Sequence, residues 1–296
     1  MKVVFVLAPG VHLLDLAGPA QVFHDELLGY DLHWVAEDVE VTTAQGLPVR
    51  ARTAWPELAA DDLVVVPGWH SPSLAATFAL GQVTLDRVKA HHDNGGMVVS
   101  VCAGADALGK AGLLDGRRCT THHGLQDELA RRYPRATVVR DVLYVVDGRV
   151  ATSAGIASGI DLALHLVATR HGPATAAKVA RSMVVYARRN GDERQASAML
   201  RHRSHVDDTV HRVQDLIDTR FTSTLTLAAL ADAAGVSPRT VTRLFGRATG
   251  LTPLRYQHLL RLERAEHLIG HGATVESAAH AVGFEDARML RRLRAR

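Results

Sequence analysis

Residues 97–105 combine a buried apolar run with a cysteine at its end. Met97 to Val101 predicts a buried strand, and the three small residues after Cys102 predict a sharp turn into a helix. Such a turn raises the thiol above the carboxyl edge of a sheet, beside a helix N-terminus whose dipole and free amides favour a thiolate. The pattern therefore predicts a reactive cysteine with a lowered pKa, which suits an enzyme or a sensor.

Two further side chains complete the set that activates a thiol. Asp15 lies among apolar residues just beyond the first predicted strand, and His122 follows a short extended stretch. The amides after Pro67 and after Cys102 are placed to form an oxyanion hole. Each residue also has a purely structural interpretation, because a buried cysteine is often an apolar filler, Asp15 suits a helix cap and His122 suits a surface loop. We expect a pocket here rather than an enzyme that turns over a substrate.

Strands alternate with helices along the first half of the chain. The expected strands cover 2–8, 32–36, 39–43, 63–66, 97–101 and 150–153, and the longer expected helices cover 74–92, 155–169 and 174–187. Val138-Val139 is expected to pair with Leu143–Val146 across a turn. This alternation predicts an α/β fold with a doubly wound, flavodoxin-like sheet. In such sheets ligands bind at the carboxyl ends of the strands, where the pattern places Asp15, Gly68, Cys102 and His122.

Length and composition narrow the class of protein. A chain of 296 residues is expected to form two domains, and the two cysteines are too few for a disulfide framework. No segment resembles a signal peptide or a membrane span, so we expect a cytoplasmic protein with no membrane partner. The 17 histidines show no metal-ligand spacing, and neither a metal nor a cofactor is expected.

Charge is divided unevenly along the chain. Residues 1–170 hold 14 Lys and Arg against 19 Asp and Glu, whereas residues 171–296 hold 20 against 12. An acidic first half joined to an Arg-rich second half indicates that the second half binds phosphates.

Short motifs through residues 1–170 resemble the PfpI-type branch of the class I glutamine-amidotransferase-like superfamily. They are Leu14-Asp15-Leu16-Ala17-Gly18-Pro19, Val65-Val66-Pro67-Gly68, Val101-Cys102-Ala103-Gly104-Ala105, Thr120-Thr121-His122 and Thr152-Ser153-Ala154-Gly155. The resemblance is greatest to the form fused to AraC-type regulators and to isonitrile hydratase. It implies that the family's cysteine, histidine and early acid correspond to Cys102, His122 and Asp15.

Three residues depart from the pattern of the family's enzymes. Ala103 stands where a threonine takes part in the hydratase reaction, His123 replaces the usual tryptophan, and Trp69 replaces a second glycine after Gly68. We therefore expect a ligand pocket, with Trp69 at its mouth, and not an enzyme. The expected pocket consists of Asp15, Gly68, Trp69, Cys102, Ala103 and His122.

A helix-turn-helix is predicted over residues 227–245. Apolar residues recur at helical spacing from Leu227 to Ala234, Gly235 suits a left-handed turn, and Ser237-Pro238 suits a helix start. The second helix is expected to point a basic, hydroxyl-bearing face outward, which suits guanine edges and phosphates. The residues of this face are Arg239, Thr242, Arg243 and Arg247.

The same unit recurs later in the chain. Ala231–Gly235 and Ala279–Gly283 share an Ala-x-x-x-Gly spacing, and a long helix from Pro253 to Gly270 is expected between them. Two such units joined by one helix resemble the AraC/XylS DNA-binding domain from about residue 207 to 296. The resemblance implies base-reading residues at Arg239, Thr242, Arg243, Arg288, Met289 and Arg292. It also implies a C-terminally shortened domain, whose second unit we expect to be less stable.

The favoured interpretation is a sequence-specific DNA-binding transcriptional regulator. Residues 1–187 are expected to bind a small-molecule effector or to form a homodimer, 188–206 to be a linker, and 207–296 to bind double-stranded DNA. The polar stretch 188–195 is similar to an Arg/Gly/Gln stretch in fused members of the family. Two alternatives remain open, namely a thiol-dependent enzyme of the isonitrile hydratase or amidase kind, and a redox sensor in which Cys102 is oxidised.

Overall fold

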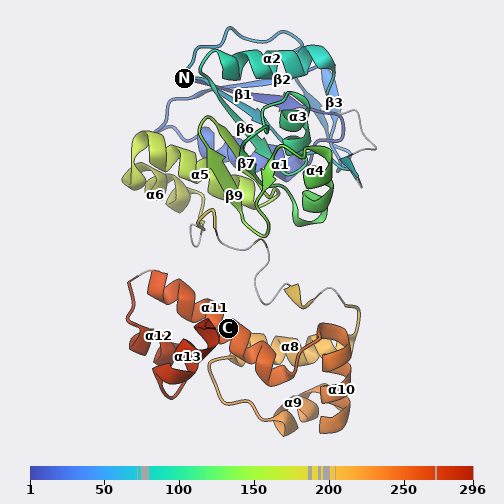
Figure 1. The fold of residues 1–296 in the computed structure, drawn as a ribbon, viewed down its shortest axis with the longest axis vertical. Helices are drawn as coiled ribbons and strands as arrows, with labels where there is room; N and C mark the ends of the chain where they lie inside the picture. Colours follow the sequence, from blue (N-terminus) through green and yellow to red (C-terminus); the bar gives the residue numbers. More distant parts are fainter. Residues whose placement is uncertain are drawn as a thin grey trace. The chain divides into compact units, whose positions relative to one another are not determined.

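The computed structural model describes residues 1–71, 73–74, 80–185, 189–192, 195, 201–203, 205–270 and 272–295. The chain divides into two compact units, Met1–Gln195 and Ala196–Arg296 (Figure 1). The division falls inside the range 188–206 that the sequence assigns to a linker. Among the described residues, no helix is long and apolar enough to cross a membrane.

A six-stranded mixed sheet forms the centre of the first unit. Its strands are β1 (Lys2–Leu7), β2 (Asp31–Ala36), β5 (Leu63–Val66), β6 (Met97–Val101), β9 (Tyr144–Asp147) and β10 (Val150–Ser153). They lie in the order β2-β1-β5-β6-β10-β9, and every neighbouring pair is parallel except β10 and β9. The central strands are buried on both faces, which is why they appear in the sequence as continuous apolar runs.

Helices cover both faces of this sheet, so the predicted doubly wound α/β fold is confirmed. Alternate residues of β1 belong to different core clusters, Val3 and Phe5 to one, and Val4 and Val6 to the other. The first cluster includes residues of α1 (Leu13–Phe23), α5 (Ser158–His171) and α6 (Pro173–Ser182). The second includes residues of α2 (Gln82–Asp93), α3 (Gly104–Lys110) and α4 (Gln126–Arg132).

The strand pairing expected at residues 138–146 is wrong. Thr137–Val138 (β8) instead pairs in parallel with Arg118–Cys119 (β7), and β9 pairs with β10. The turn at Gly148 explains this choice, because its φ of +60° suits a two-residue hairpin loop between β9 and β10. A further small hairpin joins β3 (Glu40–Thr42) to β4 (Pro48–Arg50).

Two helices are shorter than expected. The described part of the helix predicted over 74–92 begins at Gln82, and α6 ends at Ser182. Residues 75–79 and 186–187 of the expected helices lie outside the described residues, as do 188, 193–194, 196–200 and 204 of the expected linker.

The second unit contains both predicted helix-turn-helix units (Figure 1). Its helices are α8 (Asp208–Arg220), α9 (Leu227–Ala234), α10 (Pro238–Thr249), α11 (Pro253–Gly270), α12 (Val275–Ala281) and α13 (Ala287–Arg294). Side-chain oxygens cap all six of these helices by accepting a backbone N–H in the first turn, and Thr252 does so for α11 by accepting the amide of Arg255 at 3.2 Å. The capping residues of the other five helices are Asp207, Thr226, Ser237, Thr274 and Asp286.

Each helix-turn-helix unit has its own apolar core, and α11 contributes to both. Tyr256 and Leu260 pack with α8, α9 and α10, whereas Ala265 packs with α12 and α13. The first turn ends α9 at Gly235, which is left-handed with φ +69° as its glycine predicts.

Arg261 of α11 is buried between these two cores, with 8% of its surface exposed. Its guanidinium donates to the carbonyls of Phe221 at 2.6 Å and Ser223 at 2.9 Å, just after α8, and to that of Gly283 at 2.8 Å, in the turn before α13. A buried guanidinium is tolerated only when its donors are satisfied. Arg261 therefore ties the second helix-turn-helix unit to the first.

Gly283 also marks a close backbone approach. Its φ is +87°, and a Cβ at this position would lie 1.8 Å from the carbonyl oxygen of Thr222. Only glycine lets the turn before α13 pack so closely against the end of α8.

Gly283→Ala is expected to destabilise the second helix-turn-helix unit by roughly 2–4 kcal/mol, because it adds steric overlap to backbone strain. Amide hydrogen exchange of residues 275–294 measures this directly, since it reports on α12 and α13 alone. Gly272→Ala is the matched control, with a φ of +93° and no atom within 4 Å of the added Cβ. Equal loss of protection in the two variants would show that the contact with Thr222 is unimportant.

Candidate functional site

Cys102 lies in a strained turn between β6 and α3. Its φ is +53°, a region that costs a residue other than glycine on the order of 1–3 kcal/mol. Its amide donates to the carbonyl of Ser153 at 3.0 Å, which ties the turn to β10. A Cβ added to Gly68 or Gly155 would lie 2.6 or 2.3 Å from the Cys102 Cβ. The predicted strand, sharp turn and helix are confirmed, and two glycine backbones enclose the turn.

Asp15 is fully buried in the first turn of α1, next to this turn. Its Oδ1 accepts the amide of Ile156 at 2.6 Å. Burial raises the pKa of Asp15 from 3.8 to about 6, although the Ile156 amide, the Cys102 thiol and the Gly68 amide each favour the carboxylate. Asp15, Gly68 and Cys102 are therefore brought together as the sequence predicts.

The expectation of a lowered thiol pKa is wrong. Burial, together with the negative charge of Asp15, raises the pKa of Cys102 from 9.0 to about 12. The Ala103 amide acts in the opposite direction but is outweighed. The helix that begins just after the thiol, α3, has only seven residues. Cys102 is therefore a protonated thiol at neutral pH and not a thiolate, which is the nucleophilic form.

His122 lies at the start of a short 3₁₀ turn, His123–Leu125. Its Nδ1 accepts the amide of Gly124 at 3.3 Å, and its ring packs against that of His123 with centroids 4.1 Å apart. Burial and the neighbouring His123 and His12 lower the pKa of His122. Within the described parts of the chain, no hydrogen bond joins His122 to Cys102.

Sequence reasoning did not identify a group of histidines near this edge of the sheet. His12 follows β1 and His70 follows β5, and their rings lie 5.9 Å apart. His12 also lowers the pKa of His122, which connects this pair to His122 and His123. Both His12 and His70 follow the end of a strand, and this position is the signal in the sequence that could have identified them. The order of strands in the sheet is what brings them together. No set of three or more His, Cys, Asp or Glu in the described chain has the geometry to hold a metal ion.

The structure corrects the position of Trp69. Only 2% of its surface is exposed, and it belongs to the core cluster of Val4, Val6 and Leu74. Cys102 belongs to the opposite cluster. Trp69 therefore does not stand at the mouth of a pocket, because its side chain is packed in the core on the other side of the sheet from Cys102. Ala103, fully buried at the start of α3, contributes its amide next to Cys102.

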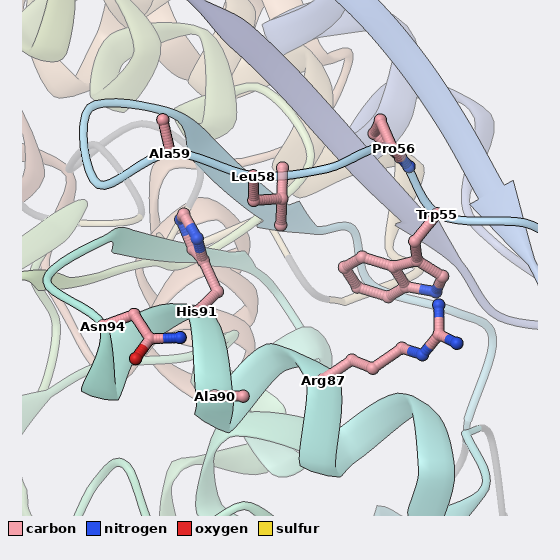
Figure 2. A pocket seen from close by; sticks show the side chains of 8 residues that line it. All are labelled: Trp55, Pro56, Leu58, Ala59, Arg87, Ala90, His91 and Asn94. Carbon is pink, nitrogen blue, oxygen red and sulfur yellow. The ribbon is translucent and has the colours of Figure 1, made fainter.

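A separate cavity of about 270 Å³ lies against α2, away from all of these residues (Figure 2). Its lining is Trp55, Pro56, Leu58, Ala59, Arg87, Ala90, His91 and Asn94. The Arg87 guanidinium lies 5.9 Å from the ring centroid of Trp55. None of the residues that the sequence singles out lines this cavity.

The second candidate site is the exposed face of α10. Arg239, Thr242, Arg243 and Arg247 are all exposed, whereas Val241 and Phe245 are buried on the opposite face. Among the described residues, none of these three arginines forms an ion pair. The predicted orientation of this helix is present in the structure.

The exposed face of α13 is different. Arg288 pairs with Asp286 at 3.0 Å, Arg294 pairs with Glu266 at 2.8 Å, and Arg291 pairs with Glu276. Arg292 is exposed and lies 3.5 Å from the sulfur of Met289. The arginines of α13 are thus largely engaged within the unit, and those of α10 are not.

Asp15 is expected to make the stability of the first unit depend on pH. Because its folded-state pKa of about 6 exceeds the ordinary value of 3.8, the folded chain keeps a proton that the unfolded chain releases between these values. Its stabilising contribution is therefore present below about pH 4 and is lost, by about 3 kcal/mol, as the pH rises to about 6. Asp15→Asn removes this slope.

Urea unfolding between pH 4 and 7, followed by tryptophan fluorescence, tests this expectation. Trp34, Trp55 and Trp69 are the three tryptophans of the chain and all lie in the first unit, so their signal reports on that unit alone. The exposed Asp38→Asn is the matched control. If wild type and Asp15→Asn lose stability in parallel from pH 4 to 6, the buried carboxyl is not the cause.

Comparison with known proteins gives a consistent result for both units. Residues 1–169 match the DJ-1/PfpI family, and residues 230–296 match a helix-turn-helix domain. The HTH-type transcriptional regulator CdhR of Pseudomonas aeruginosa is 31% identical over 291 residues, which cover 95% of this chain and 84% of that protein. Isonitrile hydratase of Pseudomonas putida is 36% identical over 177 residues, which cover 60% of this chain and 75% of the enzyme.

Solved structures show the same fold. A ThiJ/PfpI family protein from Pseudomonas syringae covers 79% of this chain and 90% of its own, with a TM-score of 0.56 and 24% identity. An AraC family transcriptional regulator from Pseudomonas putida covers 62% of this chain and 98% of its own, with a TM-score of 0.51 and 23% identity. The chain therefore belongs to the DJ-1/PfpI family, and it joins the domain of that family to a helix-turn-helix domain of the AraC type.

Proposed function

We propose that this chain is a transcriptional regulator that binds double-stranded DNA through its second unit and senses a small molecule through its first. The observation that carries the proposal is the exposed face of α10. A helical hairpin that served only packing has no need of arginines on its one free face. Similarity to the regulator CdhR along 95% of this chain supports the same function.

The spacing on α10 suits a major groove. Arg239, Arg243 and Arg247 recur at every fourth residue, so their guanidiniums follow one side of the helix. A guanidinium bonds in bidentate fashion to O6 and N7 of guanine or to a phosphate, and the methyl group of Thr242 can contact thymine. We propose these residues as the principal DNA contacts.

The second helix-turn-helix unit is proposed to add weaker contacts. Arg288 and Arg292 are exposed on α13, but Arg288 must exchange its partner Asp286 for a phosphate. Exposed ion pairs contribute little to stability, so Arg288 can make this exchange. It adds less DNA affinity than an arginine that has no ion pair to break. The first helix-turn-helix unit, through α10, is therefore proposed to supply the larger share of the DNA affinity.

The first unit is proposed to bind its effector at the edge formed by Asp15, Gly68, Cys102 and His122. The protonated thiol disfavours turnover, and within the described chain His122 is hydrogen-bonded to the Gly124 amide and not to Cys102. A group that changes protonation near pH 6 and a strained turn can still respond to an occupant. We also propose that the chain forms a homodimer, which doubles the contacts available on one DNA site. We propose that it acts in the cytoplasm, where that DNA is accessible.

The similarity to isonitrile hydratase over 177 residues favours a second candidate, an isonitrile-hydrating enzyme. Assay of the purified chain with an alkyl isonitrile decides between the two. Turnover that Cys102→Ser abolishes would establish the enzyme, and a rate equal to the buffer control would exclude it.

Arg243→Ala is expected to weaken binding to the DNA upstream of the chain's own gene by roughly tenfold or more, because one bidentate contact contributes about 1–3 kcal/mol of discrimination. Fluorescence anisotropy at several salt concentrations measures the affinity and the number of phosphate contacts. Arg212→Ala, an exposed arginine on α8, is the matched control and should change the affinity less than twofold. Binding that is insensitive to both salt and Arg243→Ala would contradict the proposal.

A further inference from the structure

The polar stretch that the sequence assigns to the linker is held firmly by the first unit. Arg189 and Asp161 form a multiple contact, in which the Arg189 amide donates to Oδ1 at 3.2 Å and its guanidinium donates to Oδ2 at 3.1 and 2.5 Å. The Asp161 side chain is only 5% exposed, and it lies in the first turn of α5. Arg189 thus satisfies the buried Asp161 carboxylate, which a freely moving linker would not do.

Gly191 continues this attachment through its backbone. Its carbonyl accepts the amides of Leu143 at 2.9 Å and Tyr144 at 3.3 Å. A Cβ at Gly191 would lie 2.8 Å from both the ring and the carbonyl oxygen of Tyr144. Glycine therefore allows the stretch to lie directly against the start of β9.

Gln195 completes the attachment at the last residue of the first unit. Its side-chain amide donates to the carbonyl of Thr121 at 2.9 Å and to that of Val142 at 3.0 Å. Its backbone amide donates to Oδ1 of Asp141 at 3.2 Å. One side chain thus joins the segment after β7 to the segment before β9. Arg189, Gly191 and Gln195 are here called the linker anchor.

The linker anchor contacts the walls of the candidate pocket. The hydroxyl of Thr121 donates to the carbonyl of Cys102 at 2.7 Å, and Thr121 is fully buried. The next residue is His122. On the other wall, Asp161 belongs to the helix that follows Ile156, whose amide binds Asp15. Both ends of the linker anchor therefore rest on segments that also hold the pocket residues.

We infer that the linker anchor transmits the state of the pocket to the DNA-binding unit, with Gln195 as the positioning residue. The inference rests on the proposed function of the first unit as a sensor. An occupant that moves the Cys102 turn or His122 also moves Thr121. The Thr121 hydroxyl is hydrogen-bonded to the Cys102 carbonyl, and His122 is the next residue in the chain. The amide of Gln195 then loses one of its two acceptors, and the last described residue of the first unit is held less firmly.

Glutamine suits this role because its amide provides two N–H donors, one for each carbonyl. Methionine has a similar length and shape but donates no hydrogen bond. Gln195→Met therefore removes the connection while retaining the volume of the side chain. Gln82→Met on α2 is the matched control, since Gln82 is exposed and its side chain, among the described residues, bonds only Asp86 of the same helix.

The first arm of the test needs no DNA and no effector. Because coupling between two sites is reciprocal, Gln195→Met must loosen the Cys102 turn, and a change at the turn must loosen the linker anchor. In full-length chains that also carry Cys119→Ala, we expect Gln195→Met to speed modification of Cys102 by methyl methanethiolsulfonate about fivefold or more. Thr121→Val, which removes the hydroxyl bonded to Cys102, should speed amide exchange of residues 189–195.

The second arm uses the modified protein. The Cys102 thiolate attacks the sulfenyl sulfur of the reagent, whose S–S bond breaks and releases methanesulfinate. The product is a mixed disulfide, Cys102 S–S–CH₃, whose S–CH₃ group serves as a small fixed occupant of the pocket. In the Cys119→Ala chain this modification should change the dissociation constant for upstream DNA about fivefold or more, a usual size for coupling between sites. In Gln195→Met the modified and unmodified proteins should bind DNA within twofold of each other, and Gln82→Met should behave as its parent.

The two arms separate the inference from the proposed function. If Gln195→Met alters exchange only at 189–195 and leaves the Cys102 modification rate unchanged, the linker anchor is a packing contact and the inference fails. An equal shift in DNA affinity with and without the Gln195 amide also overturns it. If the unmodified parent chain binds no DNA, the proposed function fails, and the first arm still decides whether the pocket and the linker anchor are coupled.

Discussion

The strained turn at Cys102 is the constraint on which the first unit depends. A positive φ at a residue with a side chain persists only when the surrounding structure enforces it. Here the enforcing contacts come from β10 through Ser153, from the backbones of Gly68 and Gly155, and from the buried Asp15. Three segments of the chain thus meet at this residue, namely α1, the loop after β5 and the end of β10 with the loop that follows it.

The same enclosure determines the chemistry of the site. Removal of water favours the neutral forms of both Asp15 and Cys102, and this effect exceeds the opposing contribution of nearby amides. The turn therefore has the backbone shape that presents a nucleophile, but the Cys102 thiol is not ionised. The result is a site in which a bound group can act on the geometry of a turn more readily than a thiolate can act on a substrate.

The second unit follows a different logic, since its two helix-turn-helix units have separate small cores. Their mutual placement depends on α11 and on the carbonyl contacts of Arg261 with the end of α8 and with Gly283. This connection fixes how α10 and α13 are held within the unit. The two helices are nevertheless unequal among the described residues, because three of the four arginines of α13 have acidic partners and the arginines of α10 have none.

The sequence by itself determined the alternation of strands and helices, the turn at Cys102, the helix start at Ser237 and the outward face of α10. These features depend on residues close together in the chain, whose periodicity and turn preferences are visible in the sequence. Tertiary structure decided the rest. It paired β9 with β10, turned Trp69 into the core, raised the thiol pKa, grouped His12 and His70 with His122, and attached Gln195 beside Thr121. Each of these outcomes depends on burial or on contacts between distant segments, and neither quantity can be obtained from local sequence patterns.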